Sequence, residues 1–344
     1  MNEWKGAGMS IKVISPGLLC TIQDAGRHQY KKDGIITSGA MDLDACKIAN
    51  LLTGNNMEEA CLEICMKGPE LYFENSYLIA LSGADLSPML DGVAVKMWRP
   101  IWVPKGSTLS FGAPRSGCFT YLAVAGGFNI PKVLESYSTY LAARFGGYKG
   151  RALMKNDVLE CNTAKEILPL LNSIYRLGSG NHVVEAHWAP DPQLLPAYDE
   201  NPVIRFIRGP EWQLFSKASQ DALLNEPFKV SARSNRMGYQ LQGPELSLSR
   251  PAEILSSAVT FGTVQVPGSG NPIILTADHQ TTGGYPRIAN VISADFSPLV
   301  QTQAGKNIYF KETTLADAHQ LLSEQGNKLE LLRMAIHLKL NQPV

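Results

Sequence analysis

The apolar residues of the chain fall mostly in short runs that are rich in β-branched and aromatic side chains. Runs of this kind, bounded by turn-forming residues, predict β-strands rather than helices. Thirty glycines and 21 prolines punctuate the chain, which is typical of sheets that close into barrels or sandwiches. The predicted strands are Ile11–Ile14, Tyr77–Leu81, Ile101–Val103, Cys118–Val124, Val203–Ile207, Thr263–Val266, Pro272–Leu275 and Asn307–Phe310.

Two segments have the spacing of an amphipathic helix instead. One runs from Met41 to Leu52, and a second is predicted to begin after Thr314, whose hydroxyl can cap it. The residues expected on the apolar faces are Ala45, Ile48, Ala49 and Leu52 in the first helix and Leu315, Ala318, Leu321 and Leu322 in the second. The chain is therefore predicted to be mainly β with a few helices.

The length of 344 residues favours two domains over one. The segment Ala189–Pro196 contains three prolines, which favour an extended connector between them. We therefore expect an N-terminal β-rich lobe at residues 9–188 and a C-terminal lobe at residues 198–325. Residues 326–344 are expected to form a C-terminal tail or helix, and residues 1–8, which precede Met9, are interpreted as a start-site extension or tag remnant.

The charge balance excludes several classes of partner. Thirty-one basic residues match 31 acidic ones, so the formal net charge is zero and nothing favours a nucleic acid or an anionic membrane. Zero net charge also gives little protection against self-association, which suits a protein that works within a complex.

The six cysteines lie in mostly apolar contexts. No apolar stretch approaches the roughly 18 residues of a membrane span or forms a signal peptide. We expect a cytoplasmic protein.

Several familiar cofactor sites are missing from the sequence. It has no G-x-x-x-x-G-K-[ST] phosphate-binding loop. His182 and His187 flank Glu185 at a separation of five residues, which does not fit a helical zinc site, and we predict no metal site. Lys67 follows Met66 but lacks the context of a biotin-attachment lysine.

The densest group of polar side chains is the string Thr276–Pro286. It follows the apolar run Pro272–Leu275 and places a carboxylate, an imidazole, a carboxamide and two hydroxyls within a few positions. Gly283 and Gly284 then admit a positive φ or the close approach of another backbone or a ligand. This density of polar groups directly after a core strand indicates a functional loop, although an elaborate turn is the alternative.

A second polar segment, Ser231–Tyr239, offers two guanidiniums, an amide and a phenol. Arginines and amides recognise carboxylates and amides through paired hydrogen bonds. This segment lies about forty residues before the Thr276–Pro286 string, with the predicted strand of Gln265 between them. We expect both loops to fold over one barrel mouth, so that Arg236 and Asp278 face one mostly apolar pocket and touch a single small amide.

The ordered set of such segments resembles the allophanate-hydrolase-subunit-2 family. This family includes the C subunit of bacterial 5-oxoprolinase, the kinase-inhibitor-antagonist proteins and the carboxyltransferase region of urea carboxylase. The resemblance extends from about Ile11 to about Leu322 and implies two cyclophilin-like β-barrel lobes. The matching segments are Gly17–Arg27, Ser38–Asp42, Ala125–Gly127, Asn235–Tyr239, Gln265–Pro267 and Thr276–Pro286.

The resemblance leaves three functions open. The first is the C subunit of an ATP-dependent 5-oxoprolinase, which opens 5-oxo-L-proline to L-glutamate together with the A-like and B-like proteins of that enzyme. The second is a carboxyltransferase that acts on urea or a similar amide with biotin carried by another protein. The third is a non-enzymatic antagonist of a kinase-inhibitor protein. We favour the first, with ATP used by the complex and no activity from the chain alone.

Chemistry on a small amide needs a polarised carbonyl oxygen and acid–base assistance. We assign catalytic roles to Asp278 as the acid/base or amide-orienting carboxylate, to His279 as a weaker proton-transfer candidate, and to Arg236 as a charge-stabilising group. The candidate substrate-binding residues are Asn235, Tyr239, Gln265, Gln280, Thr281, Gly283, Gly284 and Tyr285. One departure from the family affects this assignment: Ser257 stands where the resemblance implies a glutamate.

Overall fold

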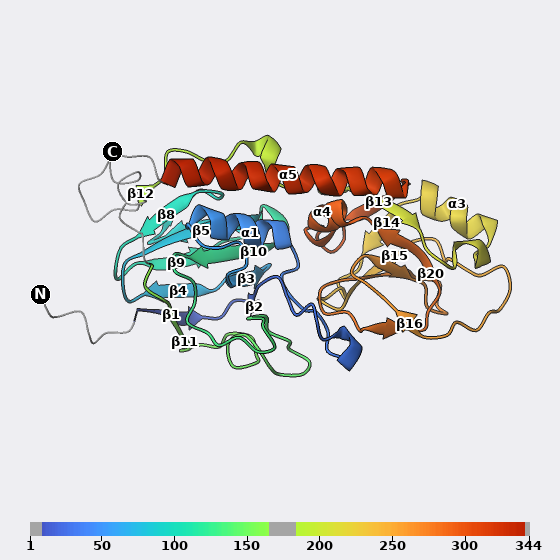
Figure 1. Ribbon diagram of the computed structural model, residues 1–344, viewed down its shortest axis with the longest axis horizontal. Coiled ribbons are helices and arrows are strands. Elements are labelled where there is room, and N and C mark those ends of the chain that lie inside the picture. The colour runs from blue at the N-terminus through green and yellow to red at the C-terminus, as the bar shows by residue number, and fades with distance from the viewer. Residues whose placement is uncertain (1–8, 165–183, 341–344) are drawn as a thin grey trace, which may run out of the picture. The chain divides into compact units, whose positions relative to one another are not determined.

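The computed structural model describes residues 9–164 and 184–340 of the chain (Figure 1). These residues divide into two compact units. Unit 1 contains the described residues up to Gly26, Leu43–Leu195 and those from Lys328 onward, and unit 2 contains Arg27–Asp42 and Pro196–Asn327. The division near Leu195 falls within the proline-rich connector segment.

Unit 1 is built from two six-stranded sheets in which all pairings are antiparallel. The first sheet has the order β11-β1-β4-β9-β6-β7, with β1 (Ser10–Ser15), β4 (Glu70–Phe73), β6 (Pro88–Leu90), β7 (Val93–Ala94), β9 (Thr108–Phe111) and β11 (Val158–Glu160). The second has the order β12-β8-β5-β10-β3-β2, with β2 (Leu19–Gln23), β3 (Cys61–Cys65), β5 (Tyr77–Asp85), β8 (Pro100–Val103), β10 (Ser116–Val124) and β12 (Val184–Glu185).

The main core of unit 1 lies between these sheets. Ile11 and Val13 of β1 join one buried cluster with Ile22, Leu62 and Leu122 of the second sheet. The alternating positions in each strand supply this cluster because successive side chains of a strand point to opposite faces of the sheet.

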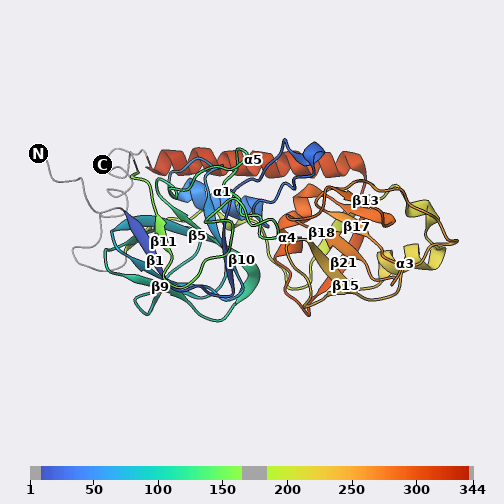
Figure 2. The ribbon, with the colours of Figure 1, turned by 90° about the horizontal axis from the view of Figure 1, so that it is seen from below.

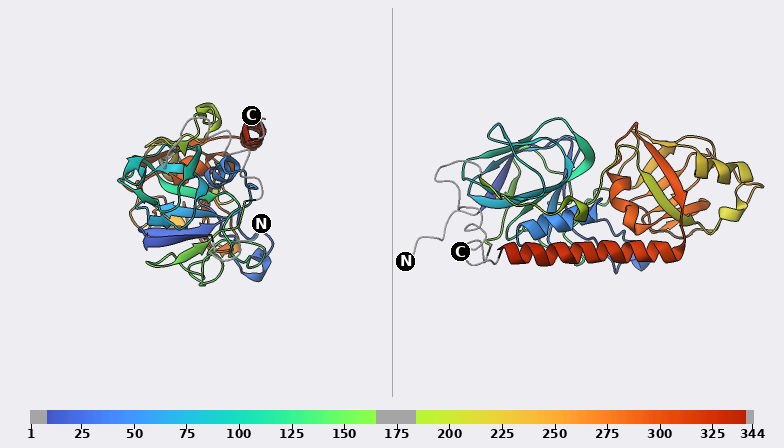
Figure 3. Two further views of the ribbon diagram at one scale, coloured as in Figure 1. Left: turned by 90° about the vertical axis from the view of Figure 1, so that its left-hand side faces the viewer. Right: turned by 90° about the horizontal axis from the view of Figure 1, so that it is seen from above.

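Helices cover the outer face of the second sheet. α1 (Leu43–Leu52) and the later part of α5 (Leu315–Leu340) pack with this sheet through a second apolar cluster that includes Leu52, Leu78, Leu332 and Ile336 (Figure 3). The helix predicted from Met41 to Leu52 is confirmed, and its four expected apolar-face residues are all buried.

The C-terminal helix is longer than the sequence suggested. α5 continues without a break through Gly326 to Leu340, so the predicted boundary at residue 326 falls inside one helix. A single glycine costs a helix only about 1 kcal/mol relative to alanine, which the packing of the later turns offsets. Two residues of the predicted apolar face, Leu315 and Leu322, are exposed, and the helix buries Leu332, Ile336 and Leu340 instead.

Unit 2 contains a closed barrel with the strand order β13-β20-β17-β18-β15-β14-β21 (Figure 2). Its strands are β13 (Val203–Arg208), β14 (Phe228–Val230), β15 (Gly238–Gln242), β17 (Thr263–Gln265), β18 (Ile273–Leu275), β20 (Arg287–Val291) and β21 (Asn307–Glu312). The remaining elements are a two-stranded ribbon of β16 (Ser257–Ala258) and β19 (Thr282–Gly283), the helices α3 (Lys217–Asn225) and α4 (Phe296–Val300), and 3-10 turns at Lys31–Asp33, Trp212–Leu214 and Ser293–Asp295. Unit 1 has one further 3-10 turn at Pro192–Leu194.

The prediction of a mainly β chain with two β lobes is confirmed, and each predicted strand overlaps a strand of the structure. The lobes differ in construction, because unit 2 closes into a barrel whereas unit 1 is formed by two separate sheets. Among the described residues, no helix is long and apolar enough to span a membrane.

The segment Arg27–Asp42 belongs to unit 2, although the sequence prediction placed it in the N-terminal lobe. Asp42 explains part of this assignment. Its carboxylate accepts hydrogen bonds from Ser297 Oγ at 2.7 Å, Gln301 Nε2 at 2.9 Å and Tyr198 Oη at 2.7 Å. These partners are more than 150 positions away in the chain, so apolar periodicity gives no sign of them.

Candidate functional site

The two polar segments of unit 2 emerge at the same end of a strand pair. β15 and β18 are antiparallel, with Gly238 opposite Leu275. The turn that precedes β15 therefore lies beside the loop that follows β18. Thr276 Oγ1 donates to the carbonyl oxygen of Arg236 at 2.7 Å, and the Asp278 N–H donates to the same oxygen at 2.7 Å. The strand pairing thus joins segments that are forty residues apart.

Arg236 and Asp278 form a buried ion pair at this junction. Arg236 Nε lies 2.9 Å from Asp278 Oδ2, Arg236 Nη2 lies 2.9 Å from Asp278 Oδ1, and the two side chains are only 5% and 6% exposed. Ser38 Oγ also donates to Asp278 Oδ1 at 2.7 Å, and Arg236 Nη2 donates to the Gly39 carbonyl at 2.6 Å. The pair therefore holds the segment Arg27–Asp42 and both polar loops together.

This geometry corrects the expected use of the pair. The two groups bind each other directly, whereas the sequence prediction had both of them face one pocket and contact a single small amide. Both carboxylate oxygens of Asp278 accept hydrogen bonds from the guanidinium, which holds the carboxylate in a fixed orientation. The arrangement favours an orienting role for Asp278 over proton transfer, and it engages Arg236 in the same contact.

His279 has the chemical properties of a proton-transfer group. Its side chain is buried, and burial lowers the pKa of the imidazole, with the nearby Lys31 contributing in the same direction. Nδ1 lies 2.6 Å from the carbonyl oxygen of Gln280, a contact that requires the proton on Nδ1. His279 is therefore a neutral imidazole whose Nε2 has the lone pair of a hydrogen-bond acceptor or base.

Gln265 brings a carboxamide to the same region from β17. The residue is 2% exposed, and its Oε1 accepts a hydrogen bond from Gln280 Nε2 at 3.4 Å. Its Nε2 is buried and has no hydrogen-bond partner within the part of the chain that the structure describes. Buried donors are nearly always satisfied in proteins, so this atom is an unusual feature.

The double glycine of the loop serves close approach rather than an unusual backbone conformation. Neither Gly283 nor Gly284 has a positive φ. A Cβ atom on Gly283 would lie 2.3 Å from Gln265 Nε2, whereas a Cβ on Gly284 would lie 3.1 Å from Ser256 Oγ. Position 283 must therefore be a glycine, because the Gln265 carboxamide packs against it and leaves no room for a side chain. Gly284 and the neighbouring Tyr285 are exposed.

Three other candidates have structural contacts of their own. Asn235 Oδ1 accepts from the Met237 N–H at 2.8 Å and so stabilises its own turn. The Tyr239 hydroxyl is buried and donates to the Val300 carbonyl at 2.5 Å. The Thr281 carbonyl accepts from the backbone N–H of Val259 at 3.2 Å. These contacts build the scaffold of the loop region.

The candidates predicted from the sequence did not include Ser38, Gly39 and Ser257. Ser38 and Gly39 belong to a segment whose polar, glycine-containing character was visible. The contact of Ser38 with Asp278 spans 240 positions, and the contact of Gly39 with Arg236 spans 197. Ser38 also has φ of 55°, which is uncommon for a residue other than glycine. The hydroxyl of Ser257 is buried and has no hydrogen-bond partner among the described residues, a feature that only the structure reveals.

Other parts of the chain offer less chemistry. Within residues 9–164 and 184–340, no group of three or more histidine, cysteine or acidic side chains is arranged to hold a metal ion. Glu185 accepts a hydrogen bond from the Lys96 N–H, and His182 lies outside the described residues.

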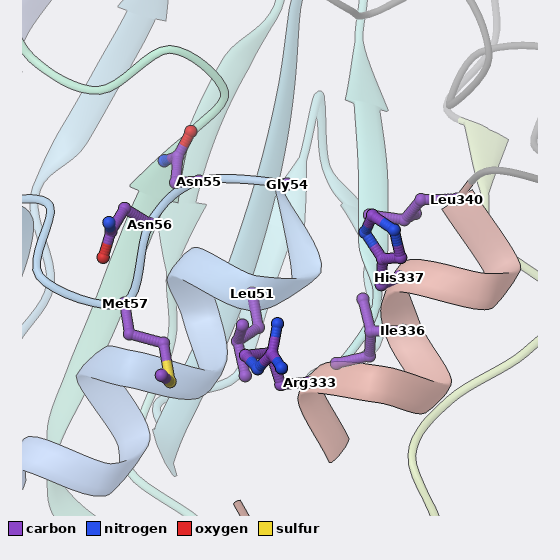
Figure 4. A pocket seen from close by; sticks show the side chains of 9 residues that line it. All are labelled: Leu51, Gly54, Asn55, Asn56, Met57, Arg333, Ile336, His337 and Leu340. Carbon is purple, nitrogen blue, oxygen red and sulfur yellow. The ribbon is translucent and has the colours of Figure 1, made fainter. Parts of the chain in front are cut away.

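A pocket in unit 1 lies between the end of α1, the turn after it and the last turns of α5 (Figure 4). At about 280 Å³ it is slightly smaller than the roughly 300–1,000 Å³ typical of small-molecule sites. It contains none of the candidate site residues. Its lining consists of Leu51, Gly54, Asn55, Asn56, Met57, Arg333, Ile336, His337 and Leu340.

Comparison with known proteins identifies relatives along nearly the whole chain. Residues 33–312 match the family described as the carboxyltransferase domain, subdomain A and B. The chain is 38% identical over 327 residues to the C subunit of 5-oxoprolinase from Escherichia coli strain K12 and 36% identical over 329 residues to the protein of the same name from Haemophilus influenzae. These matches cover 95% and 96% of this chain and 99% of each relative.

A solved structure supports the same grouping. The crystal structure of Kluyveromyces lactis urea carboxylase matches with a TM-score of 0.85 and 30% identity. The match covers 96% of this chain and 30% of that longer protein.

Proposed function

Because the chain belongs to the carboxyltransferase-domain family, subdomain A and B, we propose that it is the C subunit of an ATP-dependent 5-oxoprolinase complex, which opens 5-oxo-L-proline to L-glutamate. The observation that carries this proposal is its end-to-end similarity to two bacterial proteins named as the C subunit of 5-oxoprolinase. The burial of polar groups suited to an amide at one end of the unit 2 barrel supports it.

The ring opening adds water across an amide bond. The C–N bond breaks, the water oxygen bonds to the carbonyl carbon, and the nitrogen gains a proton. In our proposal the Gln265 carboxamide and the Thr276–Pro286 loop hold the lactam, and neutral His279 accepts or returns the proton. The Arg236–Asp278 ion pair keeps the loop in position, because it connects the loop to the turn before β15.

ATP is assigned to the complex rather than to this chain. The sequence lacks the glycine-rich loop with lysine and serine or threonine that commonly holds nucleotide phosphates. The residues of this chain therefore do not fit an ordinary phosphate cradle, and we assign no ATP-dependent step to them.

Partner proteins complete the activity in this proposal. We expect the isolated chain to be inactive and to bind the B-like protein of a 5-oxoprolinase, with the A-like protein completing the complex. A stable interface of this kind buries about 1,200 Å² or more in total.

A second function is favoured by the match to urea carboxylase. A carboxyltransferase would accept CO₂ from biotin attached to another protein and transfer it to urea or a similar amide. The ureido ring of biotin and urea are both planar groups with a carbonyl between nitrogens, so the Gln265 carboxamide and the loop N–H groups fit either one. The chemistry supplied by biotin would be the delivery of activated CO₂.

One reconstitution separates the two functions. The chain is combined with its cognate A-like and B-like proteins, and ATP hydrolysis is measured with 5-oxoproline or with urea. We expect hydrolysis that depends on 5-oxoproline and on all three proteins. Robust 5-oxoproline-dependent hydrolysis without this chain would contradict its role. Transfer of labelled bicarbonate to urea, when a biotinylated protein is supplied, would favour the carboxyltransferase.

A further inference from the structure

Two buried polar atoms of unit 2 have no hydrogen-bond partner in the described chain and lie beside the same glycine, Gly283. They are Gln265 Nε2, on the barrel strand β17, and Ser257 Oγ, on the short strand β16. Leaving a buried polar group unpaired costs roughly 1–3 kcal/mol. Two such groups in one place therefore point to a ligand that completes their hydrogen bonding.

The strand register places both groups on the same face of the ribbon. Ser257 is directly opposite Gly283 in the antiparallel pair of β16 and β19. Side chains of directly opposed residues project from the same face, with Cβ atoms roughly 4.5–5.5 Å apart. The Cβ position of Gly283 points at Gln265 Nε2, at 2.3 Å. The Ser257 hydroxyl and the Gln265 amide end thus adjoin the space that the absent Gly283 side chain leaves.

The contact of Gln265 with Gln280 indicates the hydrogen-bonding character of the first group. Gln280 Nε2 donates to Gln265 Oε1, which assigns the carbonyl end of Gln265 to Gln280 and turns the NH₂ end toward Gly283. A serine hydroxyl rotates to donate to whatever acceptor is near. The face therefore presents two neutral N–H and O–H donors.

We propose that Gln265 and Ser257 form a two-donor site for the carbonyl oxygen of the small amide, with Gly283 providing the room for it. This inference rests on the proposed function and adds Ser257 as a substrate-binding residue. A carbonyl oxygen has two lone pairs and accepts both donors. Its negative charge grows as water adds to the carbon, so the two hydrogen bonds strengthen in the transition state. Neutral donors suit this neutral carbonyl.

The kinetic test uses matched pairs of variants in the assembled complex. Ser257→Ala removes one donor, and Gly283→Ala fills the space beside Gln265. The changes Ser256→Ala and Gly268→Ala are the controls, because both residues are exposed and a Cβ atom on Gly268 would meet nothing within 4 Å. We expect each of the first two to lower kcat by about 10²-fold, the effect of one oxyanion-stabilising donor, and the controls to stay near wild type. Thermal unfolding checks that each variant folds.

Equal effects of Ser257→Ala and Ser256→Ala, or normal turnover by folded Ser257→Ala, would overturn the proposal. If the wild-type complex turns over 5-oxoproline but the variants do too, the proposed function stands and this site fails. If the wild-type complex has no such activity, the proposed function fails and the site is judged from crystals of the full chain.

The crystallographic test adds 5-oxoproline, or urea, to crystals of the full chain. An oxygen of the added amide within hydrogen-bond distance of both Gln265 Nε2 and Ser257 Oγ supports the site. A water molecule that binds both atoms at saturating amide, or a direct hydrogen bond between the two side chains, overturns it. Proline, which lacks the lactam carbonyl, is the control ligand and is expected not to occupy this position.

Discussion

The buried ion pair of Arg236 and Asp278 makes a quantitative prediction about the substitution Asp278→Asn. Both charged hydrogen bonds measure 2.9 Å, and both side chains are almost completely buried. Neutralising the carboxylate leaves the guanidinium charged and buried with a weaker acceptor, which costs about 3–5 kcal/mol. Asparagine retains one oxygen for Arg236 or Ser38, so we expect a loss near the lower end of this range, about 3 kcal/mol.

A matched control comes from an exposed pair in the same unit. Lys217 and Asp221 on α3 form an i, i+4 ion pair with side chains that are 79% and 48% exposed. Solvent screens this pair, so Asp221→Asn should cost under about 0.5 kcal/mol. A double-mutant cycle with Arg236→Met and Asp278→Asn should give a coupling free energy above about 2 kcal/mol, because removing both charges leaves neither one unpaired.

Native-state hydrogen exchange provides the assay, since it reports the opening of β15 and β18 separately from unit 1. The opening free energy of these strands should fall in Asp278→Asn and stay unchanged in Asp221→Asn. An Asp278→Asn protein as stable as wild type would refute the ion-pair argument. If that stable variant also lost about 10²–10⁴-fold in turnover, the result would favour Asp278 as a catalytic acid or base.

Three further predictions follow from individual residues. Arg236→Lys should destabilise unit 2 although it conserves the charge, because lysine cannot make the planar two-pronged contact with Asp278. Amide hydrogen exchange in this variant as slow as in the wild type would contradict this. Burial lowers the pKa of His279 in the folded state below its value of about 6.5 in the unfolded state. Below pH about 6.5 the unfolded state therefore binds more protons than the folded state. The free energy of unfolding accordingly falls as the pH drops from about 6.5 toward the folded-state pKa of His279. His279→Gln should therefore flatten the fall of Tm between about pH 7 and pH 5, and an unchanged slope would count against it. Leu134 and Glu135 have φ of 53° and 63° in a two-residue hairpin turn. Glu135→Gly should therefore raise the free energy of unfolding by about 1 kcal/mol. A lower free energy of unfolding in urea for this variant would contradict the argument that Glu135 is strained.

Much of the fold could be predicted because the strands carry their own signal. β13 and β18 consist largely of β-branched and aromatic residues between turns, and α1 repeats its buried residues with helical spacing. The packing of α5 was harder to predict. Leu315 and Leu322 have helical spacing like Leu332 and Ile336, but local sequence does not say which turns meet a sheet.

The site was predictable only in part, for a related reason. The density of polar residues after a core strand identified the loop, and strand pairing explains why Arg236 lies near Asp278. Their direct pairing, the hydroxyl of Ser38 on the same carboxylate and the unpartnered hydroxyl of Ser257 depend on contacts across many residues. Such polar contacts leave no periodic pattern in the sequence.

The central claim is that this chain supplies an essential part of a lactam-opening complex. The most direct measurement is the formation of glutamate from 5-oxoproline by the chain with its cognate A-like and B-like proteins and ATP. We predict glutamate from the complete mixture, none when this chain is omitted, and none from the chain by itself. Glutamate formation at the full rate without this chain, or none from a complex that assembles with it, would contradict the account.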